Sequence, residues 1–175
     1  MTTLVTQPIQ DVAEFLAHAL ELEVESAERY RELSDSMDVH NNPEVAELFR
    51  KLARYGDAHA EEVMALAREF VLPKISPWDF KWNCPDSPEL PCMDDAHYLM
   101  TKCQALELAL HNEERGRDFY VEVVGNSPDA EVRRIAGEMA DEEETHVAML
   151  REWMAREACE IQTVPEDLDP PNMPE

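Results

Sequence analysis

Apolar side chains recur at steps of three and four residues in four separate stretches of this 175-residue chain. That spacing places them on one face of an α-helix and leaves polar residues on the opposite face. No competing pattern of alternating apolar and polar residues, which would mark a β-strand, is found in these stretches. They cover residues 10–35, 42–70, 106–123 and 127–153. The pattern predicts an all-α protein with four long helices.

Two of these helices have recognisable N-terminal signals. The tripeptides Asn42-Pro43-Glu44 and Ser127-Pro128-Asp129 precede the second and fourth stretches. Asn and Ser side chains can cap free backbone N–H groups, and proline is tolerated at the first helical position. An acid in the first turn complements the helix dipole. We therefore expect the second and fourth helices to begin at these tripeptides.

The two halves of the chain repeat each other. An overlay of the first and third predicted helices aligns three pairs of residues, and a slightly shorter offset aligns a histidine pair from the second and fourth. The pairs are Ala19 with Ala109, Glu23 with Glu113, Tyr30 with Tyr120, and His59 with His146. Such a repeat indicates a duplicated helical hairpin.

A segment of different character, residues 71–101, connects the halves and is rich in proline and aromatic residues. A tight turn does not need so many residues, but a bundle whose second and third helices run parallel does. We expect its aromatic residues to pack on the bundle and a short helix near Asp94–His97. Residues 1–163 then form one four-helix bundle, and the acidic, proline-rich residues 164–175 form a tail that cannot be helical.

Composition narrows the possible partners. The net charge of −24 argues against nucleic acid, because phosphate would be repelled. The longest apolar run is far too short to span a membrane, so no membrane partner is expected. The N-terminus has no basic region followed by an apolar block, so no secretory signal is expected and a cytoplasmic location is the default.

The four cysteines carry little functional signal. Cys84, Cys92, Cys103 and Cys159 are too widely spaced for the Cys-x-x-Cys pairs of a zinc ribbon or a rubredoxin-like iron site. The favoured interpretation is plain thiols. A disulfide in the connecting segment and a metal site that also recruits His97 stay open as alternatives.

The most informative positions are acidic and imidazole side chains on the apolar faces of the predicted helices. Glu23, His59, Glu113, Glu143 and His146 all lie near the middle of their helices, where the four faces of a bundle meet. Burying carboxylates and imidazoles together is costly unless a cation compensates them. Glu143 and His146 are three residues apart and so project toward one point. Oxygen and imidazole donors suit iron, manganese or zinc.

Each single glutamate is followed seven residues later by a tyrosine, Tyr30 after Glu23 and Tyr120 after Glu113. Two turns separate each pair, roughly 10 Å along the axis. Helical side chains lean back toward the N-terminus, so each hydroxyl is expected to approach the carboxylates and to orient a metal ligand.

At these residues the chain resembles the rubrerythrin-type branch of the ferritin-like superfamily, over about residues 10–158 apart from the connecting segment. In that family two single glutamates and two Glu-x-x-His pairs bind two irons. The resemblance assigns Glu23 and Glu113 to the single glutamates, Glu143 and His146 to one pair, and His59 to the other. It implies redox activity toward dioxygen or hydrogen peroxide, or ferroxidase activity, and a homodimer.

Two glycines depart from the family pattern. Gly56 stands where the second Glu-x-x-His pair has its glutamate, and Gly116 where rubrerythrins have a further glutamate. Among the remaining acids, Glu62 is the best candidate to replace the missing carboxylate. Glycine in a helix interior is unfavourable by about 1 kcal/mol relative to alanine. The two glycines therefore indicate either open space beside the metals or close helix–helix packing.

The resemblance also leaves the electron donor unidentified, because the chain has no rubredoxin-like pairs of cysteines. Two alternatives to an enzyme stay open. One is iron storage or delivery without turnover, inside an oligomer. The other is a degenerate bundle that has lost tight metal binding and serves as an interaction module.

Overall fold

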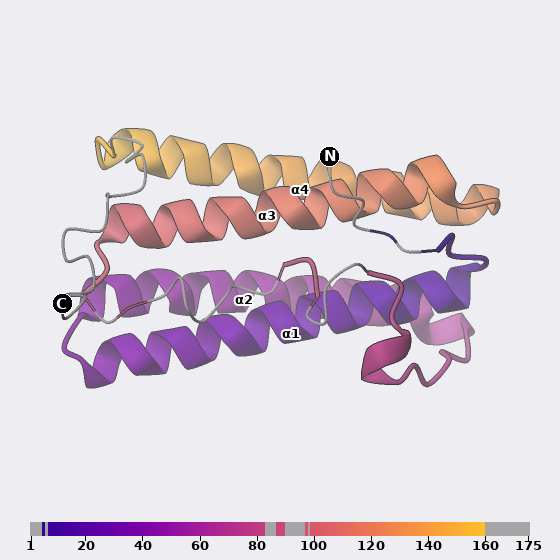
Figure 1. The fold of residues 1–175 in the computed structure, drawn as a ribbon, viewed down its shortest axis with the longest axis horizontal. Helices are drawn as coiled ribbons and strands as arrows, with labels where there is room; N and C mark the ends of the chain where they lie inside the picture. The colour runs from indigo at the N-terminus through magenta and orange to yellow at the C-terminus, as the bar shows by residue number, and fades with distance from the viewer. Residues whose placement is uncertain (1–4, 6, 83–86, 90–96, 98, 160–175) are drawn as a thin grey trace, which may run out of the picture.

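The computed structural model describes residues 5, 7–82, 87–89, 97 and 99–159, and these form a bundle of four long α-helices (Figure 1). Two short 3₁₀ helices follow the second long helix. In chain order the elements are α1 (Val12–Val39), α2 (Pro43–Leu66), η1 (Ala67–Glu69), η2 (Pro77–Asp79), α3 (Lys102–Asn126) and α4 (Ala130–Arg156). The predicted all-α bundle is confirmed. No helix in the described part is long and apolar enough to cross a membrane.

The helices begin where side chains can satisfy free backbone N–H groups. Asp11 accepts a hydrogen bond from the N–H of Glu14, and Asp129 accepts from two N–H groups at the start of α4. Thr101 and Gln104 form a reciprocal capping box at the start of α3. Asn42 occupies the capping position of α2, but its side chain donates to the carbonyl of Met100 instead of capping the helix.

α1 packs along α2, and α3 packs along α4, so the chain forms two helical hairpins. Figure 1 shows that α2 and α3 run in the same direction, so the chain returns along the bundle between them. This is the arrangement that the length of the connecting segment predicts.

The first part of the connecting segment is anchored on α1. His18 is fully buried and accepts a hydrogen bond from the backbone N–H of Lys81. The rings of Phe80 and Trp82 stack on each other and meet the imidazole of His18 edge to face. Trp78, in contrast, is 87% exposed, so the expectation that the aromatic residues pack on the bundle is wrong for that residue.

Buried apolar side chains form two clusters with a polar layer between them. One cluster includes Phe15 and Phe119, and the other includes Phe49 and Leu150. Every long helix contributes to both clusters. At mid-length the apolar face of each helix is interrupted by polar or small residues. Those interruptions contain the glutamates and histidines of interest: Glu23, Gly56, His59, Glu113, Gly116, Glu143 and His146. The core thus places this set in one layer across the bundle.

Two cysteines are joined in a disulfide. Cys103, in the first turn of α3, is bonded to Cys159, just after α4, with their Cα atoms 5.4 Å apart. The interpretation of these two as plain thiols is wrong, because an antiparallel hairpin brings the start of one helix to the end of the next. Cys84, Cys92, the helix expected near residues 94–97 and the tail at 164–175 lie wholly or mostly outside the described residues.

Candidate metal centre

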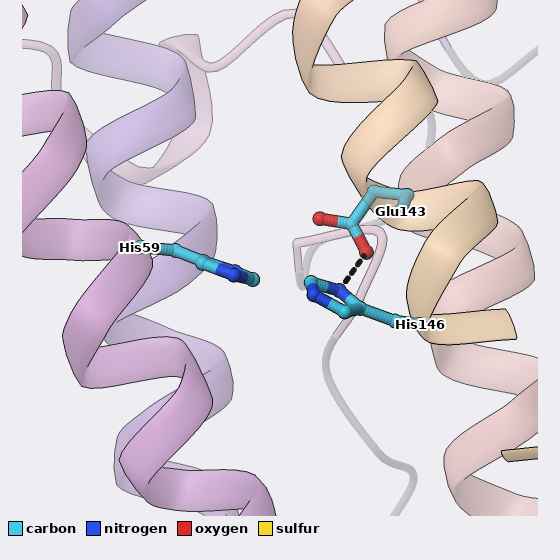
Figure 2. Close-up of side chains that lie close together, drawn as sticks. All are labelled: His59, Glu143 and His146. Carbon is cyan, nitrogen blue, oxygen red and sulfur yellow. Dashed lines mark hydrogen bonds and ion pairs between the residues drawn. The ribbon is translucent and has the colours of Figure 1, made fainter. Parts of the chain in front are cut away.

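The five residues singled out by their positions on apolar faces converge in the polar layer. Glu23 and Glu143 are almost fully buried, and Glu113, His59 and His146 are only slightly exposed at their side chains. Figure 2 shows His59 reaching from α2 toward Glu143 and His146 on α4. These five side chains therefore lie in the interior of the bundle and not on its solvent-exposed surface.

Each histidine faces at least one glutamate through its Nδ1 atom. Nδ1 of His59 lies 3.4 Å from a carboxylate oxygen of Glu23. Nδ1 of His146 lies 3.2 Å from Glu143 and 3.4 Å from Glu113. The two imidazole rings stack on each other with centroids 4.5 Å apart. The fold therefore brings these residues, which were predicted from the sequence, into direct contact.

Glu143 occupies the centre of this arrangement. Its carboxylate belongs to two groups whose potential ligand atoms all lie within 4.8 Å of one another. We call them the histidine group, which contains His59, Glu143 and His146, and the carboxylate group, which contains Glu23, Glu89 and Glu143. Each group could hold a metal ion, and Glu143 belongs to both.

Glu89 is a site residue that sequence reasoning missed. It lies in the connecting segment, outside any helix, and is only 3% exposed. A narrow cavity beside the polar layer is lined by Glu89 together with Glu23, His59, Glu113 and His146. Periodicity carries no information in a non-helical segment, and the only sequence signal was the unexplained glycine at position 116.

The two glycines serve different purposes. A Cβ atom added to Gly56 would lie 3.0 Å from Cβ of Ala27, so this glycine allows α2 to pack closely on α1. A Cβ atom added to Gly116 would overlap the carboxylate of Glu89, with Cγ and Cδ of that residue 2.6 Å away. Of the two explanations, close packing therefore applies to Gly56 and space applies to Gly116, where the space is filled by Glu89.

Glu62, the predicted replacement carboxylate, has an exposed side chain and belongs to neither group. It lines a neighbouring cavity together with Glu23, His59 and Glu142. A ligand role for Glu62 stays a prediction, but the carboxylate that the fold places among the buried glutamates is that of Glu89.

The two tyrosines contact the site differently. The hydroxyl of Tyr120 donates a hydrogen bond to Oε1 of Glu23 at 3.2 Å, so a tyrosine of one half contacts the glutamate of the other. The hydroxyl of Tyr30 accepts a long hydrogen bond of 3.5 Å from the side-chain amide of Asn112. Burial raises the pKa of both tyrosines well above the ordinary value, so both hydroxyls stay protonated.

The electrostatics of the layer reflect crowded negative charge. Burial raises the pKa of Glu143 well above its ordinary value, and the charges of Glu113 and Glu23 raise it further. Burial followed by the charge of Glu23 does the same to the pKa of Glu89. For His59 and His146, burial lowers the pKa, but contacts with Glu23 and Glu113 outweigh it and leave both values raised. Protons thus compensate the metal-free layer, and bound cations would displace them.

Comparison with known proteins agrees with this geometry. Residues 14–78, which cover α2 and all but the first two residues of α1, match the family described as rubrerythrin. The chain is 42% identical to an uncharacterized conserved protein from Magnetospirillum magnetotacticum MS-1, whose crystal structure it matches with a TM-score of 0.66. That match covers 88% of this chain and 99% of the other. This chain belongs to the rubrerythrin-type ferritin-like family. A comparison with curated proteins gives no match.

Within the rubrerythrin-type family, the donor set of this chain can be tested against a pair of metal ions. The family pattern calls for four carboxylates and two imidazoles, and the helices here supply Glu23, Glu113, Glu143, His59 and His146. One Oε atom of Glu89, almost fully buried beside them, has no hydrogen-bond partner among the described residues. The buried donors therefore fit a metal site in number, chemistry and proximity.

Proposed function

We propose that this rubrerythrin-type protein binds two iron ions between its four helices and uses them in redox chemistry with dioxygen or hydrogen peroxide. The reaction is then oxidation of ferrous iron or reduction of peroxide. The observation that supports the proposal best is the position of Glu143, which belongs to both donor groups. One carboxylate common to two groups is the feature expected of a bridged pair of ions.

In this proposal Glu23, Glu113 and Glu143 hold the ions through oxygen, while His59 and His146 hold them through nitrogen. Neither donor group of the described residues contains a thiolate, and oxygen with imidazole nitrogen suits iron or manganese. Zinc accepts the same donors but has no redox chemistry, so it could occupy the site without turnover. Iron both accepts these donors and has the redox chemistry that the proposed reaction needs.

Bound iron would supply one electron per ion on oxidation from the ferrous state, so two ions match the two electrons that reduce hydrogen peroxide to water. The chain's own residues contribute in other ways. Two apolar clusters exclude bulk water from both ends of the polar layer. Tyr120 holds the carboxylate of Glu23 in one orientation through its hydrogen bond. The donor that returns electrons is a separate partner.

The test begins with protein stripped of metal by a chelator and loaded anaerobically with ferrous iron. We expect two irons per chain by elemental analysis, and about one peroxide consumed for each two irons oxidised, followed by absorbance. Glu143→Gln should lose most of the bound iron. Glu152→Gln, an exposed position near the end of the same helix, is the matched control and should keep it. Protein that stays metal-free, or iron inert to both oxidants, would contradict the proposal.

The same preparation separates the alternatives. Many irons per chain in a large assembly, measured by light scattering, would indicate storage or delivery without turnover. A mass of two chains would agree with the homodimer that the family resemblance implies. A bundle that binds neither iron nor zinc would indicate an interaction module.

A further inference from the structure

The connecting segment places a further acidic side chain inside the bundle, beside the glutamates that the helices supply. Glu89 is 3% exposed, and Ser87, two residues before it, is fully buried. One carboxylate oxygen of Glu89 has no hydrogen-bond partner among the described residues. A buried oxygen without a partner is unfavourable, and a carboxylate more so, unless a ligand satisfies it.

α3 leaves room for this side chain at position 116, three residues after Glu113. Gly116 has no side chain, and a Cβ atom there would overlap the Glu89 carboxylate. A glycine inside a helix is unfavourable by about 1 kcal/mol relative to alanine, so the gap has a specific use. That use is to admit a carboxylate from the connecting segment to the face of α3 that carries Glu113.

The oxygens of Glu89 lie with those of Glu23 and Glu143 in the carboxylate group, all within 4.8 Å of one another. The histidine group has two imidazoles and shares only Glu143 with it. The two groups therefore differ in chemistry. One offers oxygen alone, which suits a hard cation, and the other offers nitrogen as well, which suits iron or zinc.

We propose that Glu89 is a metal ligand delivered by the connecting segment, and that it completes the ion position formed by Glu23 and Glu143. The proposal rests on the metal site of the proposed function and adds the residue that makes its second ion position. Glu89 supplies the fourth carboxylate, which the helices lack because Gly56 replaces a glutamate. Four carboxylates also balance the charge of two divalent cations, whereas three would leave a buried excess of positive charge.

Three variants test the proposal by counting ions instead of measuring activity. Metal-free protein is titrated anaerobically with Fe²⁺ and, separately, with Mn²⁺, and bound metal is measured by calorimetry and elemental analysis. Wild-type protein should bind two ions. Glu89→Gln, which keeps the size of the side chain, should keep the ion of the histidine group and weaken the other by more than about 100-fold.

Gly116→Ala provides a second and independent test, because it leaves the Glu89 side chain unchanged but takes its space. It should lose the same ion as Glu89→Gln. The matched control is Gly125→Ala on the same helix, where an added Cβ atom meets nothing within 4 Å. That variant should bind two ions like the wild type. Circular dichroism confirms that each variant is helical before titration.

The outcomes distinguish this inference from the proposed function. If the wild type binds two ions and both Glu89→Gln and Gly116→Ala bind two ions equally tightly, Glu89 is not a ligand and the inference is overturned. If the wild type binds no metal, the proposed function fails first. Should Glu89→Gln not fold, Gly116→Ala with its Gly125→Ala control decides the question.

Discussion

At the scale of single residues, the centre depends on polar groups held where water cannot reach them. Glu23, Glu143 and Tyr120 are all almost fully buried, and the tyrosine hydroxyl contacts a Glu23 oxygen. A buried carboxylate that loses a donor is left partly unsatisfied. The role of Tyr120 can therefore be measured in the metal-free protein, where its hydrogen bond acts without help from a cation.

We expect Tyr120→Phe to lower the free energy of unfolding of the metal-free protein by about 1–3 kcal/mol, because one buried hydrogen bond to a carboxylate is lost. Urea unfolding followed by circular dichroism measures this. Tyr30→Phe is the comparison: its hydroxyl takes part in a longer contact of 3.5 Å with Asn112, so a smaller loss is expected. Equal stability of Tyr120→Phe and the wild type would contradict the role of this hydrogen bond.

At the scale of elements, the α3–α4 hairpin is closed covalently at the end where α3 begins. The bond between Cys103 and Cys159 links positions 56 residues apart in sequence. A cross-link over such a separation restricts the conformations of the unfolded chain and so stabilises the folded state relative to it. The histidine group takes two of its three residues from α4, so the stability of this hairpin supports the site.

Reduction of this disulfide should lower the free energy of unfolding by about 2–4 kcal/mol. Thermal unfolding with and without a reductant measures the loss as a fall in Tm. The Cys103→Ser variant is the control, because it should already have the lower Tm and should change little on addition of reductant. A reductant that leaves the wild-type Tm unchanged would mean that this bond contributes little to stability.

At the scale of the whole molecule, protons and metal ions compete for the same buried layer. The pKa values of Glu89, Glu143, His59 and His146 are all raised in the folded protein, mainly by burial for the glutamates and by neighbouring carboxylates for the histidines. The folded state therefore binds more protons than the unfolded state between each ordinary pKa and its raised value. Stability from these groups is present at low pH and is lost as the pH rises.

We expect the free energy of unfolding of the metal-free protein to fall as the pH rises from about 5 to 8, by up to about 1.4 kcal/mol per pH unit for each group that titrates. Thermal unfolding measures this loss as a fall in Tm. Glu143→Gln should show a shallower fall, since it removes one such group. With iron or manganese bound, stability should instead hold or rise with pH, because metal binding releases protons. A metal-free Tm that increases over this range would contradict the raised pKa values.

The helices, the repeat and the five helical site residues could be predicted from the sequence because their signals are local. A side chain three or four residues from an apolar neighbour lies on the same face wherever the helix is placed, and this is how Glu23, Glu143 and His146 were recognised. The same reasoning predicted that α2 and α3 run parallel, from the length of the segment between them. These features need no knowledge of long-range contacts.

Glu89, the Tyr120–Glu23 hydrogen bond and the Cys103–Cys159 bond were decided only by tertiary structure. Each joins parts of the chain that no periodicity relates, and Glu89 belongs to a non-helical segment whose path depends on how it packs on the finished bundle. The sequence by itself determined which helix faces are buried and that these faces carry charge. Packing determined which carboxylate fills the gap at Gly116, because only the folded bundle brings that gap and the connecting segment together.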